Sequence, residues 1–315
     1  MTPARAGSRT GNRHTAQRWA AMLRGAGRRV SVTTEWDGAP ADLLIALHAR
    51  RSHGSIARYR AAHPRGALIV VLTGTDLYRD LPASAEAQRS LEIATRLVVL
   101  QDEARRVLEP RHRRKARVVY QSSDAALRHA PPRNRFRVAV IGHLREEKDP
   151  FRAAAALARL RRDDFEVVQV GDALSPAMAA QARQWMAREP RYRWLDGRPH
   201  AQALAWIARS HALVVSSVME GGANVICEAA RIGTPVLASR ISGNLGMLGR
   251  RYPGYYRLGD DSALARLMAR SAADAPYLLR LKRALRERRA LFAPAAERSA
   301  LNALVRETLA RARPA

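Results

Sequence analysis

Residues Ser217–Ala230 read SVMEGGANVICEAA, and residues Gly233–Ala238 read GTPVLA. A β-branched run at Ala212–Ser216 comes before them, and Gly221 and Gly222 follow that run. The order of strand, glycine turn, helix and second strand is typical of a βα unit in a parallel sheet. Glycines let the backbone approach a ligand closely, and the open N–H groups at the start of such a helix suit a diphosphate.

Two glutamates frame this stretch at positions eight apart. Glu220 ends the strand, and Glu228 lies about one turn into the helix. We therefore expect both carboxylates to face one crevice, where they can bind sugar hydroxyls. An isolated pair at this spacing is more often solvated, but the strand, glycines, helix and following strand together favour a ligand site.

A second motif stands at Val138–Pro150, which reads VAVIGHLREEKDP. It predicts a strand, a loop and a helix in which Asp149 is the cap and Pro150 the first residue. Lys148 would then have the helix dipole behind it and could neutralise the charge on a departing diphosphate. Alone this would be an ordinary surface loop, but opposite the Glu220 motif it predicts a phosphate site.

Short β-branched runs alternate with alanine-rich amphipathic stretches along the whole chain, as in α/β proteins with parallel sheets. We expect strands at Arg29–Thr33, Leu43–Leu47, Leu68–Leu72, Leu97–Leu100, Arg117–Tyr120, Arg137–Ile141, Glu166–Val170, Ala212–Ser216 and Pro235–Ala238. We expect helices at Ala16–Gly25, Ser55–Ala62, Ser84–Thr95, Pro150–Arg161, Pro176–Arg188, His200–Ser210 and Asn224–Ile232.

Paired prolines interrupt this pattern at Ala130–Asn134 and predict a domain boundary. The sequence thus predicts two Rossmann-like, doubly wound domains that face a central cleft, over residues 1–130 and 131–290, and a helix over 291–315 that packs back on the body. The loop Gly7–Thr15 should follow a central apolar strand, yet Met1–Ala6 offers none. We therefore expect that the natural start lies upstream or that the first domain is compromised.

Composition restricts the function. The net charge of +27 suggests nucleic acid, but arginines spread evenly along the chain, and the run Arg111–Lys115 lacks interleaved aromatic residues. We expect that run to be a solvated loop. The single cysteine, Cys227, excludes an internal disulfide, and no apolar run approaches the roughly 20 residues that cross a bilayer. We expect a cytoplasmic protein that binds neither membrane nor nucleic acid.

Sequence signatures of metals and other cofactors are also missing. No Asp-x-Asp pattern occurs, and neither Gly-x-Gly-x-x-Gly nor a Walker sequence is present. The sequence therefore predicts a protein that needs no metal and no cofactor.

Polar loops of the first half follow expected strands or open a helix, and in a doubly wound domain such loops gather where ligands bind. Arg9, Arg13 and Arg50, with N–H groups near Thr15, could clamp a small phosphate-like anion, although each arginine alone is more often a surface residue. The candidate acceptor residues are Arg9, Asn12, Arg13, Thr15, His48, Arg50, Gly74, Thr75 and Asp76. His48 and Asp76 are explained equally well as loop residues that bond to the backbone.

The two motifs of the second half resemble the donor domain of retaining GT-B glycosyltransferases. That family carries a Gly-Arg-Leu loop ending in Lys-Gly, then Glu-Gly, and a second glutamate eight residues after the first. The matching residues are Gly142, Lys148, Glu220, Gly221 and Glu228, and the chain departs from the pattern at His143 and at Asp149 and Pro150.

The resemblance implies that Lys148 holds the diphosphate, Glu228 the ribose hydroxyls and Glu220 the transferred sugar, with the turn at Arg198 against the base. The implied catalytic residues are Lys148, Glu220 and His143, and the implied donor-binding residues are Gly142, Arg198, Gly221, Gly222, Asn224 and Glu228.

Taken with the loops of the first half, these motifs are similar to those of the selenosugar synthases of selenoneine biosynthesis. The resemblance implies transfer of N-acetylglucosamine or glucose from a UDP-sugar to the selenium of selenophosphate, with formation of a C–Se bond and release of UDP. Two alternatives stay open, which are a conventional glycosyltransferase with an alcohol or lipid acceptor and a basic nucleic-acid-binding protein. The preferred hexose and the oligomeric state are also open.

Overall fold

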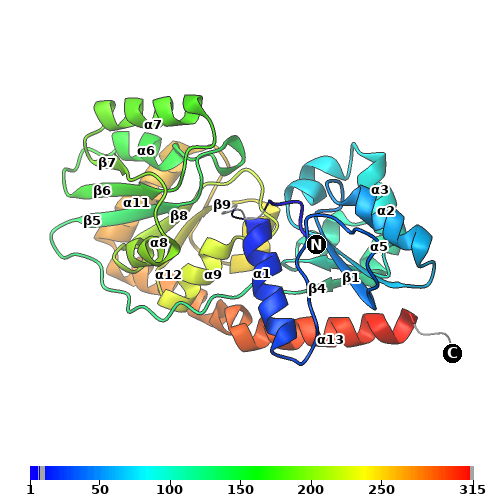
Figure 1. Cartoon of the computed structure of the whole chain (residues 1–315). Helices are drawn as coiled ribbons and strands as arrows, with labels where there is room; N and C mark the ends of the chain where they lie inside the picture. The colour runs from blue at the N-terminus through cyan, green and yellow to red at the C-terminus, as the bar shows by residue number, and fades with distance from the viewer. Residues whose placement is uncertain (6, 8–10, 313–315) are drawn as a thin grey trace. The chain divides into compact units, whose positions relative to one another are not determined.

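The computed structural model describes residues 1–5, 7 and 11–312, and its contacts divide the chain into two units. Unit 1 comprises Met1–Gln121 and Pro294–Ala315, and unit 2 comprises Ser122–Ala293. Each unit contains one parallel sheet with helices around it (Figure 1). The predicted α/β class is therefore confirmed. The change of unit lies before the proline pair at Pro131 and Pro132, and the last helix belongs to unit 1.

Unit 1 is built on a four-stranded sheet in the order β1-β2-β3-β4, with every pair parallel. Its strands are β1 (Leu43–Leu47), β2 (Ala67–Leu72), β3 (Arg96–Val99) and β4 (Ala116–Val118). Its helices are α1 (Gly11–Arg24), α2 (His53–Ala62), α3 (Ala85–Ile93), α4 (Ala104–Val107), α5 (Pro110–Lys115) and α13 (Pro294–Ala312), with a π-helical turn η1 at Asp76–Asp80.

Strand β2 shows why this sheet is covered on both faces. Every residue of its sequence ALIVVL is buried, as expected for a central strand of a parallel sheet. Leu68 and Val70 pack into one core cluster with α2 and α3, whereas Ile69 and Val71 pack into another with α1 and α13. The alternation of side chains along the strand thus supplies both cores.

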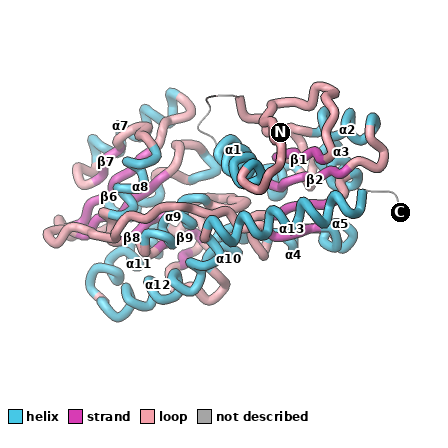
Figure 2. Tube along the Cα trace, turned by 60° about the horizontal axis from the view of Figure 1, so that its bottom comes forward, coloured by secondary structure: helices cyan, strands magenta, loops and turns pink. Residues whose placement is uncertain are grey.

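The last helix, α13, is fastened to unit 1 by two carboxylates. Glu297 is 1% exposed and accepts hydrogen bonds from Trp19 Nε1 at 2.6 Å and from the Arg18 guanidinium at 2.9 and 3.2 Å. One turn from its end, Glu307 binds both Arg96 of β3 and Arg117 of β4. Figure 2 shows α13 running along this sheet.

Met1 and Thr2 belong to the segment Met1–Ala6, in which the sequence offers no apolar strand. The Met1 amine donates to Ile45 O at 2.6 Å, and Leu47 N donates to Met1 O at 3.2 Å, so Met1 pairs with β1. On the other side, Thr2 N donates to Thr33 O at 2.9 Å. The prediction of a strand at Arg29–Thr33 is wrong, because only this one backbone bond joins that segment to Met1 and Thr2. Burial lowers the pKa of the Met1 amine to about 6.

Unit 2 is built on a six-stranded sheet in the order β10-β9-β8-β5-β6-β7, again with every pair parallel. Its strands are β5 (Phe136–Ile141), β6 (Phe165–Val170), β7 (Tyr192–Trp194), β8 (Ala212–Val215), β9 (Val236–Ser239) and β10 (Tyr255–Tyr256). Its helices are α6 (Arg152–Ala158), α7 (Pro176–Arg188), α8 (His200–Ala208), α9 (Asn224–Ile232), α10 (Ser242–Leu248), α11 (Asp261–Ala273) and α12 (Ala275–Arg288), with 3₁₀ turns η2 at Glu146–Lys148 and η3 at Arg289–Phe292.

The strand order of unit 2 reverses at β5. The chain goes from β5 to β6 and β7 on one side, and then returns to place β8, β9 and β10 on the other side. In open parallel sheets, ligands bind at the carboxyl ends of the two strands that flank such a reversal. The fold therefore points to the loops that follow β5 and β8.

Two local predictions are corrected by the structure. The run Arg111–Lys115 is not a loop but lies in the helix α5, which has Pro110 in its first turn and continues with good helix formers. In the same way, α1 begins at Gly11 rather than at Ala16, so the loop expected at Gly7–Thr15 is partly helical. In the part of the chain that the structure describes, no helix has the length and apolar character needed to span a bilayer.

Glu297→Ala is expected to lower the free energy of unfolding of unit 1 by about 3 kcal/mol, because it leaves Arg18 and the buried Trp19 N–H without their acceptor. Chemical denaturation measures this change. Arg306→Ala, at an exposed position of the same helix, is the control and should stay within about 0.5 kcal/mol of wild type. Equal stability of the two variants would contradict the role given to Glu297.

Candidate functional site

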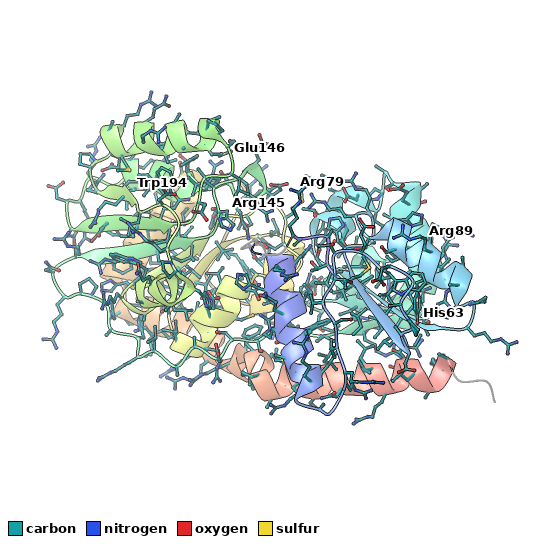
Figure 3. The ribbon with its side chains drawn as sticks, viewed as in Figure 1. His63, Arg79, Arg89, Arg145, Glu146 and Trp194 are labelled. Atoms are coloured by element: carbon teal, nitrogen blue, oxygen red, sulfur yellow. The ribbon has the colours of Figure 1, made fainter. Side chains whose placement is uncertain are left out.

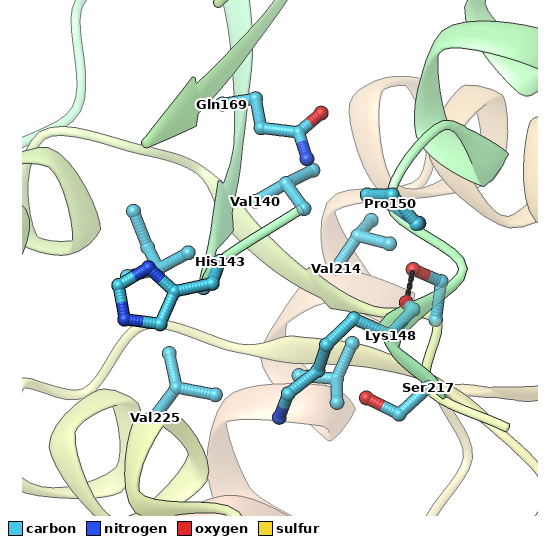
Figure 4. Close-up of a pocket in the computed structure, with 12 residues that line it drawn as sticks. Val140, His143, Lys148, Pro150, Gln169, Val214, Ser217 and Val225 are labelled. Atoms are coloured by element: carbon cyan, nitrogen blue, oxygen red, sulfur yellow. Dashed lines mark hydrogen bonds between the residues drawn. The ribbon is translucent and has the colours of Figure 1, made fainter. Parts of the chain in front are cut away.

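A pocket opens in unit 2 at the carboxyl ends of β5 and β8, where the strand order reverses. Val140, Val214 and Val225 form its apolar part. The imidazole of His143, the ammonium of Lys148 and the hydroxyl of Ser217 form its polar part (Figure 4). The structure thus brings the predicted residues Gly142, His143 and Lys148 together with the first residues of the Glu220 motif.

The loop after β5 approaches the loop after β6 without a side chain between them. Gly142 N donates to Val170 O at 2.9 Å, and a Cβ on Gly171 would lie 2.0 Å from Gly142 O. Both glycines have positive φ, at 148° and 155°. A larger residue at Gly171 would push the Gly142 loop into the pocket, so this close approach sets the position of the loop.

The segment before α6 differs from the prediction. Helix α6 begins at Arg152, and Asp149 does not cap it but adopts the left-handed conformation with φ 43°. The Asp149 carboxylate instead accepts from Arg152 Nε at 2.7 Å. Lys148 is the last residue of a 3₁₀ turn, and α6 begins only at Arg152. Lys148 is therefore not in the first turn of that helix. Upstream of Lys148, Arg145 and Glu146 project from this loop (Figure 3).

Strand β8 holds the backbone of the Lys148 loop. Ser216 Oγ donates to Lys148 O at 3.0 Å and to Asp149 O at 2.8 Å. Val218 N donates to Glu147 O at 2.9 Å. Two segments far apart in sequence therefore present their functional side chains from one rigid junction.

Lys148 and Glu220 form an ion pair in this junction. The Lys148 ammonium donates to Glu220 Oε1, and Ser217 Oγ donates to the same oxygen at 2.6 Å. The Glu220 side chain is 9% exposed and that of Lys148 is 24% exposed. A carboxylate this deeply buried needs a cation or several donors, and here it has both. A phosphate or a sugar entering the pocket would exchange with one member of this pair.

Residues behind the pair fix its geometry, although neither sequence motif includes them. Ser239 Oγ donates to Ser217 O at 2.6 Å, and Asn244 Nδ2 donates to Ser239 O at 2.9 Å. A Cβ on Gly243 would lie 2.2 Å from Glu220 O, so α10 packs directly against the Glu220 backbone. The signal in the sequence was the Ser-Gly-Asn order at 242–244, which looks like a turn but opens α10.

Glu228, the second glutamate, has its own basic partner. It is 8% exposed, and His200 Nε2 donates to its Oε1 at 2.8 Å. This hydrogen bond raises the pKa of His200. The structure therefore pairs Glu220 with Lys148 and Glu228 with His200, and His200 also lies outside the two sequence motifs.

The start of α9 lies between the two glutamates in the chain. Ala223 at the N-cap supplies no side-chain hydrogen bond to the first turn, and among the described residues the buried Asn224 Oδ1 has no partner. Gly221 is buried and Gly222 is half-buried. The first N–H groups of α9 thus receive no acceptor from its N-cap side chain, as an anion site requires.

The turn after β7 is built around Asp172. A Cβ on Gly197 would lie 1.7 Å from Asp172 Oδ1, so a larger residue there would displace the Asp172 carboxylate. His143 Nδ1 lies 3.5 Å from Asp172 Oδ2. Arg198, the predicted contact to a base, is exposed.

Asp76 of unit 1 serves a structural role. It is fully buried, and its carboxylate accepts from Thr73 N at 2.8 Å, Gly74 N at 2.9 Å and Ala49 N at 2.9 Å. These bonds join the loop after β2 to the loop after β1. With both oxygens occupied by backbone donors, Asp76 is poorly placed to act as a base.

His48 is held in the same way. Its Nδ1 accepts from Arg51 N at 3.3 Å, which leaves the proton on Nε2, and Nε2 lies 3.1 Å from Thr75 Oγ1. His48 is 1% exposed, and burial lowers its pKa. A neutral histidine with both nitrogens engaged orders this loop.

The remaining candidates of unit 1 include two guanidinium groups in different environments. Arg50 Nε lies 2.9 Å from Asp80 Oδ2, whereas Arg13 Nε is buried and has no partner among the described residues. Asn12 is half-buried, and Arg9 lies outside the described residues. Thr15 is inside α1, where its hydroxyl donates to Gly11 O and accepts from Gln121, so its N–H does not stand at the opening of the helix.

No group of three or more His, Cys, Asp and Glu side chains within residues 1–5, 7 and 11–312 could hold a metal ion.

Comparison with known proteins gives a family match for most of unit 2. Residues 135–274 match the family described as glycosyl transferases group 1. No curated protein matches the chain.

Several solved structures are similar to the chain. Sucrose-phosphate synthase from Thermosynechococcus elongatus has a TM-score of 0.70 and 19% identity over 85% of this chain and 74% of its own. HepE from Anabaena, in complex with UDP-glucose, has a TM-score of 0.70 and 18% identity over 84% of this chain and 79% of its own. A glycosyltransferase from Rickettsia africae has a TM-score of 0.65 and 13% identity over 97% of this chain and 84% of its own. The chain therefore has the GT-B fold, and its residues 135–274 match the glycosyl transferases of group 1.

Proposed function

We propose that this protein is a glycosyltransferase that moves N-acetylglucosamine or glucose from a UDP-sugar to the selenium of selenophosphate. Selenium attacks the anomeric carbon, the bond from that carbon to the diphosphate oxygen breaks, and UDP leaves with the electron pair. Hydrolysis of the Se–P bond, in which water takes the phosphate group and selenium keeps the electron pair, then gives the selenosugar. The observation that carries the proposal is the pairing of Lys148 with Glu220 at the strand reversal of a domain that matches glycosyl transferases.

The donor half of the proposal follows from the charges at this junction. In the structure, Lys148 and Glu220 neutralise each other. A donor diphosphate would take the Lys148 ammonium and the N–H groups at the start of α9, and the sugar hydroxyls would take the Glu220 carboxylate. Each group of the pair thus has a matching group on a UDP-sugar, and HepE, a structural neighbour, has been crystallised with UDP-glucose.

The acceptor half rests on the absence of a free base among the described candidates of unit 1. An alcohol acceptor must lose a proton to a positioned base, but Asp76 and His48 are both occupied by loop hydrogen bonds. Selenophosphate is already an anion and needs no such base. Arg13 of the same unit is half-buried, its Nε has no partner among the described residues, and its guanidinium would supply the cationic donor.

A panel of UDP-sugars, incubated with and without selenophosphate and followed by mass spectrometry, tests the proposal. We expect UDP release that requires selenophosphate and a product with a C–Se bond. Turnover with alcohol or lipid acceptors and without selenophosphate would establish a conventional glycosyltransferase. Indifference to UDP-sugars together with salt-dependent DNA binding would establish a nucleic-acid-binding protein.

Lys148→Ala and Glu220→Gln are each expected to lower kcat/KM for the UDP-sugar by about a hundredfold or more, because each removes a charge that meets the departing diphosphate or the sugar. Steady-state kinetics measures the loss. Lys282→Ala, which removes a lysine from α12, is the control and should keep wild-type activity.

Asp76→Asn should behave differently from those two variants. It is expected to destabilise unit 1 by about 2 kcal/mol, because the amide nitrogen would face backbone donors, while the folded protein keeps most of its activity. A loss of activity at Asp76 larger than that at Lys148, in protein shown to be folded, would identify a true base and refute the scheme.

Gly243→Ala tests the packing of α10 against Glu220. The new Cβ would lie 2.2 Å from Glu220 O, so the Glu220 backbone must move and activity should fall about tenfold or more. Gly54→Ala, where the new Cβ meets only the flexible Arg58 side chain at 3.6 Å, is the control. Wild-type activity in Gly243→Ala would show that the position of Glu220 is not critical.

A further inference from the structure

His200 is the first residue of α8, and its imidazole reaches across to α9. Its Nε2 lies 2.8 Å from Glu228 Oε1, while its own side chain is 58% exposed. The two helices are also tied at their other ends, since Thr234 Oγ1, just beyond α9, donates to Ile207 O of α8 at 2.9 Å. The backbone that carries His200 is therefore held in place relative to α9.

The pairing has an electrostatic cause. A cation at the N-terminus of a helix is disfavoured by the helix dipole, so the position of His200 on α8 does not by itself favour its charged form. The charged groups that act on it favourably are Glu228 on α9 and Asp124 in the segment that precedes β5. The hydrogen bond to Glu228 is the largest of these effects and raises the pKa of His200.

Glu228 needs such a partner because it is almost completely buried. A carboxylate at 8% exposure without a cation or several donors would be costly, and it would turn toward whatever donor or water it could reach. Bound to His200 through Oε1, the carboxylate keeps one orientation and still offers lone pairs on both oxygens. A pair of neighbouring hydroxyls needs this arrangement of two acceptors.

We propose that His200 is a positioning residue that holds the Glu228 carboxylate in the orientation that accepts the two ribose hydroxyls of the UDP-sugar. The inference rests on the proposed function, and it adds a specificity-determining residue outside the two motifs. Because Glu228 would contact the nucleotide and not the reacting bond, His200 should act on donor binding and leave the chemical step almost unchanged.

Three variants test this role. His200→Ala is expected to raise the Kd for UDP and the KM for the UDP-sugar about tenfold, with kcat within about twofold of wild type. His200→Gln keeps an N–H donor near Nε2 and should restore most of the affinity. Gln202→Ala, at an exposed position of the same helix, is the matched control and should bind UDP as wild type does. Calorimetry with UDP measures the affinities, and thermal unfolding verifies that the variants fold.

The pH dependence adds a second readout. As the pH rises through the raised pKa of His200, the imidazolium loses its charge and the wild-type affinity for UDP should fall relative to His200→Gln, whose side chain does not titrate. Taking the ratio of the two proteins removes the titration of UDP itself.

Each remaining result would overturn the inference. Unchanged or tighter UDP binding by His200→Ala would mean that the imidazole does not position Glu228 or that it blocks it. Equal weakening by His200→Ala and His200→Gln would mean that the hydrogen bond is not what matters. Failure of the wild-type protein to bind UDP would refute the proposed function. If the wild-type protein binds UDP but the His200 variants do not show the expected affinities, only the role of His200 is refuted.

Discussion

The buried ion pair between Lys148 and Glu220 is the interaction on which the arrangement of unit 2 depends. Burying a carboxylate is costly unless a cation and further donors meet it, and here Lys148 and Ser217 both donate to Glu220 Oε1. Such a pair forms only if two loops from non-adjacent stretches of sequence arrive together. The hydrogen bonds of Ser216 to the Lys148 loop and the contact of α10 with Glu220 bring them there. The surrounding structure is therefore built to hold two opposite charges at the strand reversal.

Much of this could be predicted from sequence, because the signals are local. Strand β5 and helix α9 follow from apolar runs and from glycines at 221 and 222, and α7 and α9 begin and end where predicted. The proximity of Lys148 and Glu220 also follows from the sequence, since each comes after a predicted strand of the same sheet, and parallel strands end at one edge.

What sequence could not predict depends on contacts between distant residues. His200 meets Glu228 only because α8 and α9 pack together, and Gly243 matters only because α10 approaches the Glu220 backbone. The role of Asp149 was wrong for a related reason: its bond to Arg152 and the hold of Ser216 on its carbonyl replace the expected cap. In unit 1, the segment 29–33 has the composition of a strand, but strands form in pairs, and Met1 and Thr2 offer it a single backbone bond.

The two units satisfy their buried charges in different ways. In unit 2 the opposite charges of Lys148 and Glu220 satisfy each other. In unit 1 the carboxylate of Asp76 is already satisfied by the backbone, while Arg13 Nε is buried with no partner in the described residues. A buried guanidinium nitrogen without an acceptor is unfavourable. Unit 2 thus balances one buried charge with an opposite one, whereas unit 1 satisfies its buried carboxylate with backbone donors.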